Sequence, residues 1–159
     1  MQMIAARGWT TTCSRFLSSR LFLGLALAQV FLLTENVLAI EPFSTDGCSM
    51  FPDGTIAQKG LWRNCCIEHD KAYWQGGTYS ERVKADKRLR ICVAEAGAPF
   101  IAEIMLGGVR IGGSPFWPTP YRWGYGWPGL RGYKPVSANE RAEIKRRLEE
   151  LEQNELLHQ

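Results

Sequence analysis

The segment CCIEHDKAYWQGG, residues 65–77, constrains the fold of this chain more than any other stretch. It holds two adjacent cysteines, a histidine followed directly by an aspartate, and a tyrosine four residues after the histidine. Residues 61–75 contain no proline or glycine, and the Gly-Gly pair that follows can end a helix in the left-handed conformation. The segment therefore predicts a helix that carries several chemically reactive side chains.

The N-terminal residues are typical of a secretory signal peptide. Three arginines precede an apolar run at 21–33, and Val37 and Ala39 occupy the small-residue positions that a signal peptidase recognises. The alternative is an uncleaved membrane anchor, but a spanning helix needs about 20 apolar residues and this run is shorter. We expect residues 1–39 to be a signal peptide cleaved after Ala39, and the protein to be exported, either secreted or periplasmic.

Four cysteines remain after this cleavage: Cys48, Cys65, Cys66 and Cys92. An even number of cysteines in an exported chain indicates two disulfides, for which three connectivities are possible. Zinc binding is the competing interpretation, but export favours disulfides. The leader removes three arginines and Glu35 from the 19 basic and 16 acidic side chains, which leaves a net charge of about +1. This charge does not indicate a nucleic-acid partner.

A second helix is predicted directly after the first. Thr78 and Glu81 have the spacing of a capping box at a helix N-terminus, and apolar residues recur from there to about Glu95. Because the connection between the two helices is short, they should lie antiparallel.

Side chains on these two helices can form a pair that activates water. Cys65, His69 and Tyr73 are four residues apart and share one helix face. If a disulfide joined Cys65 to Cys92, His69 and Asp86 would differ by only about 3 Å in level along the helix pair. A histidine oriented by a buried carboxylate can act as a general base. The alternatives are a structural histidine and a solvated aspartate.

Asp70 follows the histidine directly and points to another side of the predicted helix. The turn-rich loop at 41–58 includes DGCSMFPDG, which supplies closely spaced backbone carbonyls. Carboxylate and carbonyl oxygens are the ligands that Ca²⁺ takes in proteins. A disulfide between Cys48 and Cys66 would hold this loop beside Asp70. A metal ion bound there would then lie next to the general base His69.

These motifs resemble the secreted phospholipase A2 superfamily, as a bacterial-type or divergent member. CCIEHDKAY is similar to the active-site helix of that family, which has two cysteines, two variable residues, His-Asp, and a tyrosine four residues after the histidine. ADKRLRIC is similar to the second helix, where an aspartate precedes a cysteine by six residues, and DGCSMF stands where the calcium loop would lie. The resemblance covers about residues 44–96. It implies a mainly α fold in which a disulfide-linked pair of antiparallel helices carries a calcium loop.

The resemblance implies calcium-dependent hydrolysis of the sn-2 ester of glycerophospholipids at a membrane surface or in micelles. It implies that His69 is the base that activates water, that Asp86 orients His69, and that Tyr73 supports Asp86. The alternative is a non-catalytic member of the same fold that binds lipid or protein.

The resemblance also implies the calcium ligands and the disulfides. The ligands are the side chain of Asp70 and the backbone carbonyls of Gly47, Ser49 and Phe51. The disulfides are Cys48–Cys66 and Cys65–Cys92. The family often has a further disulfide, and both of its positions are alanine here, Ala72 and Ala85. The usual glycine run of the calcium loop is also replaced in this chain.

The segment that follows the predicted catalytic core of residues 40–98 is rich in glycine, proline and aromatic residues. This segment, residues 99–135, can hold a short apolar helix at 99–106 and otherwise predicts an aromatic loop. One interpretation places its rings at a lipid interface, together with the arginines of the segment: Arg110, Arg122 and Arg131. The other interpretation packs the rings over the helical core.

The last segment, residues 136–159, predicts a charged amphipathic helix. Ser137 and Glu140 have capping-box spacing, and Glu143 with Arg147 is a pair four residues apart. We expect a solvated or self-associating appendage, and the sequence indicates no particular oligomeric state.

Overall fold

The computed structural model describes residues 39–157, and four α-helices account for its regular structure. They are α2 (Arg63–Gln75), α3 (Tyr79–Glu95), α4 (Pro99–Gly112) and α5 (Ala138–Leu157). No β-strand occurs within the described range, so the prediction of a mainly α protein is confirmed. None of the described helices is long and apolar enough to cross a membrane. The predicted signal peptide lies outside the described residues, apart from Ala39.

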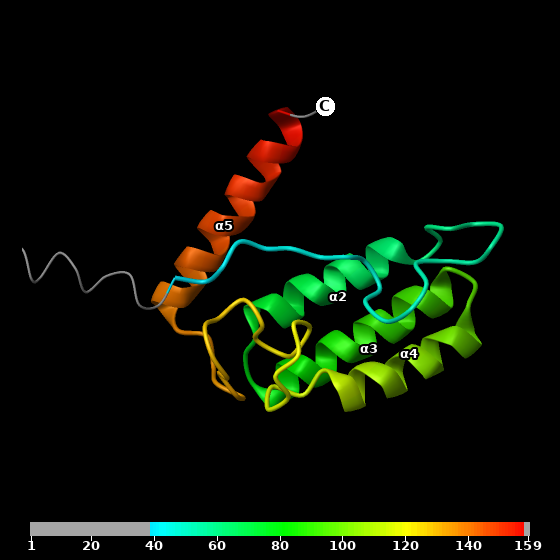
Figure 1. Cartoon of the computed structure of the whole chain (residues 1–159), viewed down its shortest axis with the longest axis horizontal. Coiled ribbons are helices and arrows are strands. Elements are labelled where there is room, and N and C mark those ends of the chain that lie inside the picture. The colour runs from blue at the N-terminus through cyan, green and yellow to red at the C-terminus, as the bar shows by residue number, and fades with distance from the viewer. Residues whose placement is uncertain (1–38, 158–159) are drawn as a thin grey trace, which may run out of the picture. The chain divides into compact units, whose positions relative to one another are not determined.

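Helices α2 and α3 form a hairpin whose connection is only three residues long (Figure 1). Gly76 and Gly77 both have positive φ angles, 70° and 136°, which glycine adopts without strain. The Thr78 hydroxyl accepts a hydrogen bond from the Glu81 N–H, and the Glu81 carboxylate accepts one from the Thr78 N–H. The predicted capping box is therefore confirmed, and it fixes where α3 begins.

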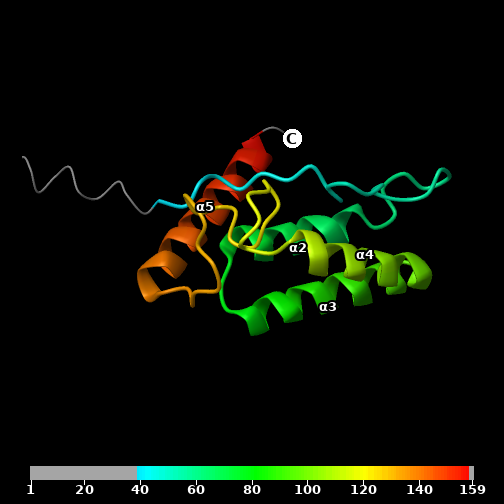
Figure 2. The same cartoon turned by 60° about the horizontal axis from the view of Figure 1, so that its bottom comes forward.

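Helix α4 packs along α3 and is longer than the predicted helix at 99–106 (Figure 2). It continues through a Gly-Gly pair, although each glycine weakens a helix by about 1 kcal/mol. Tertiary hydrogen bonds explain the difference, because Arg82 of α3 donates to the carbonyls of Val109 and Arg110 at the end of α4. The sequence of α4 alone gives no sign of this distant donor.

The main core lies between α2, α3 and α4. Its buried members are Cys48, Trp62, Cys65, Cys66, Leu89, Val93, Ala102 and Met105. All four cysteines within residues 39–157 form disulfides, so the prediction of two disulfides is confirmed. Because the bonded cysteines belong to this core or pack against it, covalent and apolar contacts hold the same elements together.

Residues 113–135 form an aromatic segment that covers the C-terminal end of α2. Four of its donors reach carbonyls at that end: Gly124 N to Tyr73 O (2.6 Å), Gly126 N to Trp74 O (3.2 Å), Trp127 Nε1 to Gln75 O (2.7 Å) and Trp123 Nε1 to Gly77 O (2.8 Å). The last carbonyls of a helix have no partner within the helix, so this segment satisfies groups that would otherwise need water. Trp123 and Trp127 are therefore structural, whereas Phe116 and Trp117 stay exposed.

The three arginines that suggested a lipid interface are held by contacts within the chain. Arg110 lies beside Asp86, Arg122 donates to three backbone carbonyls, and Arg131 forms two hydrogen bonds to Glu140. The sequence suggested that these arginines accompany the rings at a lipid interface, whereas in the structure all three have partners within the chain.

Helix α5 begins with the predicted capping box. The Ser137 N–H donates to the Glu140 carboxylate, and the Glu140 N–H donates to the Ser137 hydroxyl. Ile144 is the buried residue of this helix, and it packs in a cluster with Ile40, Trp74 and Trp127. The first half of α5 thus packs against Trp74 and Trp127, whereas Leu156 and Leu157 at its end are exposed.

Candidate active site

His69 of α2 and Asp86 of α3 are in contact in the interior. His69 Nε2 lies 3.1 Å from Asp86 Oδ1, and Asp86 has no exposed surface. The Cys65–Cys92 disulfide joins the same two helices, one turn away from His69. The structure therefore brings together the histidine and the carboxylate that the sequence suggested as a pair.

Tyr73 contacts the same carboxylate oxygen. Its hydroxyl donates a hydrogen bond of 2.7 Å to Asp86 Oδ1, and its ring packs 4.2 Å from the imidazole of His69. Burial, together with the negative charge of Asp86, raises the pKa of Tyr73 well above its ordinary value. The phenol therefore stays protonated and serves as a donor to Asp86.

Two arginines complete this network: Arg82, which the sequence did not single out, and Arg110, which the sequence suggested only for a lipid interface. Arg82 donates through Nε to the Tyr73 hydroxyl at 3.0 Å, and it also donates to Tyr133 of the aromatic segment. Arg110 Nε lies 2.7 Å from Asp86 Oδ2. Arg82 precedes Asp86 by four residues, so their shared helix face was a signal that could have found it. Arg110 comes from α4, and no local pattern links it to Asp86.

The two ring nitrogens of His69 have different surroundings. Nε2 faces Asp86, whereas Nδ1 lies 3.9 Å from the carboxylate of Asp70. Burial alone would lower the pKa of His69, but hydrogen bonds and negative charge from Asp70 and Asp86 outweigh burial and raise this pKa above its ordinary value. In the neutral imidazole, a proton held on Nε2 by Asp86 leaves the lone pair on Nδ1, on the side of Asp70.

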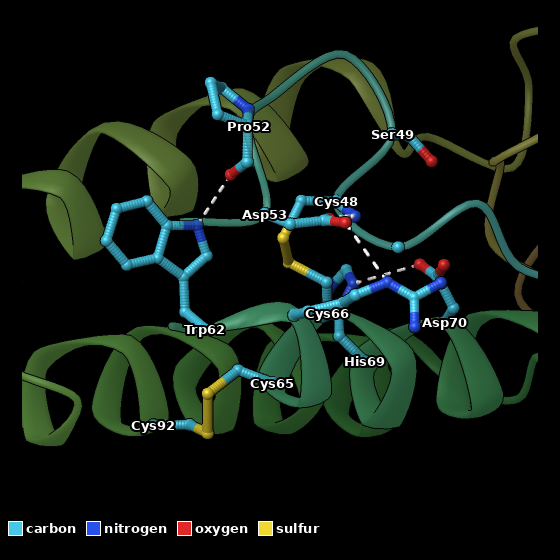
Figure 3. The surroundings of a disulfide bond; sticks show 12 residues. Cys48, Ser49, Pro52, Asp53, Trp62, Cys65, Cys66, His69, Asp70 and Cys92 are labelled. Carbon is cyan, nitrogen blue, oxygen red and sulfur yellow. Dashed lines mark hydrogen bonds and ion pairs between the residues drawn. A yellow bond between two sulfur atoms is a disulfide. The ribbon is translucent and has the colours of Figure 1, made fainter. Parts of the chain in front are cut away.

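The predicted calcium loop is attached to α2 by the Cys48–Cys66 disulfide (Figure 3). The other disulfide joins Cys65 to Cys92. Both pairings are therefore the ones that the resemblance implies. Gly47 has a φ of 86°, and a side chain there would approach the Asp53 carboxylate to 2.4 Å. That carboxylate accepts the Cys48 N–H at 2.8 Å and so fixes the course of the loop.

The predicted calcium ligands line one cavity of about 270 Å³ together with His69. They are Asp70, Gly47, Ser49 and Phe51. In place of a glycine run, the loop turns at Met50, which has a φ of 37°, and the Phe51 N–H donates back to the carbonyls of Cys48 and Ser49. The hydroxyl of Thr45 donates to Asp70 at 2.7 Å.

These candidate ligands are of the chemical type that Ca²⁺ prefers, because they are one carboxylate and several backbone carbonyl oxygens. No group of three or more His, Cys, Asp or Glu side chains in the described part of the chain could hold a metal. Any metal ion here would therefore need the loop carbonyls. Among residues 39–157, no lysine or arginine forms an ion pair with Asp70, which faces His69 Nδ1 at 3.9 Å.

Helix α4 supplies the apolar wall of this cavity. Its lining residues are Ile104, Met105, Gly108, Val109 and Gly112. At the rim, Met50 of the loop and Ile104 of α4 are 90% and 46% exposed. The site therefore draws on residues beyond the segment 40–98 that the sequence suggested as its core.

Comparison with known proteins gives no relative from which a function could be transferred. No protein-family model matches the chain, and neither the curated proteins nor the solved structures show a match. The geometry of the site is therefore the basis of the functional inference.

Proposed function

We propose that the protein is an exported phospholipase A2-like hydrolase that cleaves the sn-2 ester of glycerophospholipids with Ca²⁺. The observation that carries this proposal is the 3.1 Å contact between His69 Nε2 and the fully buried Asp86 carboxylate. A general base needs such a partner, because the carboxylate fixes the tautomer and stabilises the imidazolium that forms when a proton is taken up.

His69 acts as the base through Nδ1. This nitrogen takes a proton from water as the water oxygen attacks the ester carbonyl, and it returns the proton to the leaving oxygen when the ester bond breaks. Asp86 stabilises the imidazolium between the two steps, and the Tyr73 hydroxyl holds Asp86 in place. The four cysteines of residues 39–157 are in disulfides, so water rather than a thiol is the nucleophile at this site.

The residues beside His69 support a role for Ca²⁺. Asp70 would be the side-chain ligand, and the carbonyls of Gly47, Ser49 and Phe51 would complete the protein's contribution. When bound, Ca²⁺ acts as a Lewis acid toward the phosphate and the ester carbonyl.

The surface around the cavity suits a lipid substrate. At about 270 Å³ the cavity is smaller than those that enclose a drug-sized ligand, so most of a phospholipid would lie outside it. Phe100, Ile104 and Ile111 are spaced four and seven residues apart along α4 and are all exposed, as is Met50. An apolar rim of this kind favours substrate presented in a membrane or micelle.

Export is part of the proposal. Two disulfides form and persist in oxidising compartments, and the N-terminal residues resemble a signal peptide. We therefore place the activity outside the cytoplasm, either in the periplasm or in the medium.

The proposal is tested by fatty-acid release from mixed phospholipid vesicles by the disulfide-bonded chain of residues 40–159, with Ca²⁺ and with chelator. We expect hydrolysis that requires Ca²⁺ and falls to background in His69→Gln. Glu68→Gln is the matched control, because Glu68 is the exposed neighbour on the same helix and should leave activity unchanged. Vesicle binding without hydrolysis by the folded wild-type chain would instead indicate a non-catalytic lipid-binding protein.

A further inference from the structure

Asp86 has polar neighbours on both of its carboxylate oxygens. Oδ1 is shared by the Tyr73 hydroxyl and His69 Nε2, whereas Oδ2 lies 2.7 Å from Arg110 Nε. A fully buried carboxylate is costly to ionise unless a cation is close. Among residues 39–157, Arg110 is the only arginine or lysine that forms an ion pair with Asp86.

We propose that Arg110 is a positioning residue for the His69–Asp86 pair. Its guanidinium charge stabilises the buried Asp86 carboxylate from the Oδ2 side, and that carboxylate holds the imidazole proton on Nε2, which leaves Nδ1 free on the side of Asp70. This inference rests on the proposed function for its catalytic consequence. Its structural part, the tautomer of His69, is independent of whether the protein hydrolyses lipid.

Arg82 fixes the position from which Arg110 acts. Its guanidinium donates to the backbone carbonyl of Arg110 at 2.9 Å and to that of Val109 at 2.8 Å. Its Nε donates to the Tyr73 hydroxyl, which leaves the phenolic proton of Tyr73 for Asp86. Arg82 therefore holds both the end of α4 and the donor on the other side of the carboxylate.

The two arginines act by different means, and this difference gives a sharp test. Arg110 Nε and Asp86 Oδ2 are close but not aligned as a hydrogen bond, so Arg110 acts through its charge. Arg82 uses three nitrogens of a planar fork to reach its acceptors. Lysine can supply a charge but not that fork. Lysine should therefore replace Arg110 and should fail to replace Arg82.

The first measurement is the imidazole ¹H–¹⁵N NMR spectrum of His69 in alkaline buffer, using the disulfide-bonded chain. We expect a single Nε2–H tautomer in the wild type and in Arg110→Lys, and a mixture of tautomers in Arg110→Gln. Arg90→Gln is the matched control, because Arg90 forms an exposed ion pair with Glu103 across the same α3–α4 contact. The inference is overturned if Arg110→Gln and the wild type give the same spectrum.

The second measurement covers the case in which Arg110→Gln does not fold. The double variant Asp86→Asn/Arg110→Gln removes both charges, so it should recover a folded state that Arg110→Gln alone loses. A double variant that is as unfolded as Arg110→Gln would contradict a role exerted through the charge of Asp86.

Kinetics on vesicles separates the catalytic consequence from a general loss of structure. We expect Arg110→Gln to lower kcat by about 10- to 100-fold with KM within about twofold, because only the base is affected. Arg110→Lys should recover most of kcat, whereas Arg82→Lys should not. If the wild type hydrolyses no lipid, the proposed function fails and the NMR result still decides the inference. If the wild type is active and Arg110→Gln retains full kcat, the positioning role is refuted.

Discussion

Replacing Gly113 with alanine should damage the site through Tyr73. A methyl carbon at Gly113 would lie 2.4 Å from Tyr73 Cε1 and 2.7 Å from its hydroxyl oxygen, whereas ordinary contact begins near 3.4 Å. Tyr73 would have to move by about 1 Å, which lengthens its 2.7 Å bond to Asp86 beyond hydrogen-bond distance. Overpacking costs about 1–3 kcal/mol, and the lost bond to a charged group adds to this. We expect the free energy of unfolding to fall by about 3 kcal/mol, and vesicle hydrolysis to fall with it.

The matched control is Gly107→Ala, within the helix α4 whose C-cap is Gly113. Apart from its chain neighbours and the backbone of its own helix, nothing lies within 4 Å of the position that a Cβ would take at Gly107, so alanine should stabilise α4 by about 1 kcal/mol. The φ of Gly113 is −87°, so its substitution carries no backbone penalty and its effect is steric. Urea unfolding followed by near-UV circular dichroism measures both variants. If Gly113→Ala is as stable as the wild type, Tyr73 is not packed against the end of α4 and the reasoning fails.

Two further predictions concern the crosslink of the loop and the attachment of α5. Replacing Cys48 and Cys66 by alanine opens a loop of sequence separation 18 and should lower the free energy of unfolding in urea by about 3 kcal/mol; a change below about 1 kcal/mol would contradict the crosslink's role. The hydrogen bonds from Arg131 lower the pKa of Glu140 to about 2 from 4.5, so this carboxylate stabilises the fold above pH 4.5 and loses that contribution as the pH falls toward 2. Glu140→Gln should therefore lose less stability across that range, and parallel pH curves in urea unfolding would refute the prediction.

The helical part of the candidate site could be predicted because its signals are local. The four-residue spacing of His69 and Tyr73 fixes their shared face on α2, and the capping box fixes the first turn of α3. The separation of Asp86 from Cys92 then sets the level at which Asp86 meets His69. These relations depend only on helix geometry and on spacings of a few residues, so they can be worked out from the sequence.

The parts that the sequence did not predict depend on contacts between distant segments. Helix α4 extends beyond its predicted end because Arg82, almost thirty residues earlier in the chain, donates hydrogen bonds to the carbonyls near its C-terminus. Arg110 reaches Asp86 only because that longer helix brings it there. The aromatic segment has no periodicity, so its hydrogen bonds to the end of α2 could not be read from its composition.

The aromatic segment also stabilises the α2–α3 pair at Ala72 and Ala85. The resemblance implies that a disulfide often joins the positions of Ala72 and Ala85, and here Ala85 is buried in a cluster with Tyr73 and Trp123, against which Ala72 packs. A disulfide that closes so short a loop stabilises by about 3 kcal/mol, chiefly through the unfolded chain. Burying an aromatic side chain such as Trp123, with its bond to Gly77, is worth a similar amount, but only while the segment is folded. The C-terminal end of the helix that carries His69 is therefore held by packing and hydrogen bonds from residues 113–135, and not by a crosslink between residues 72 and 85.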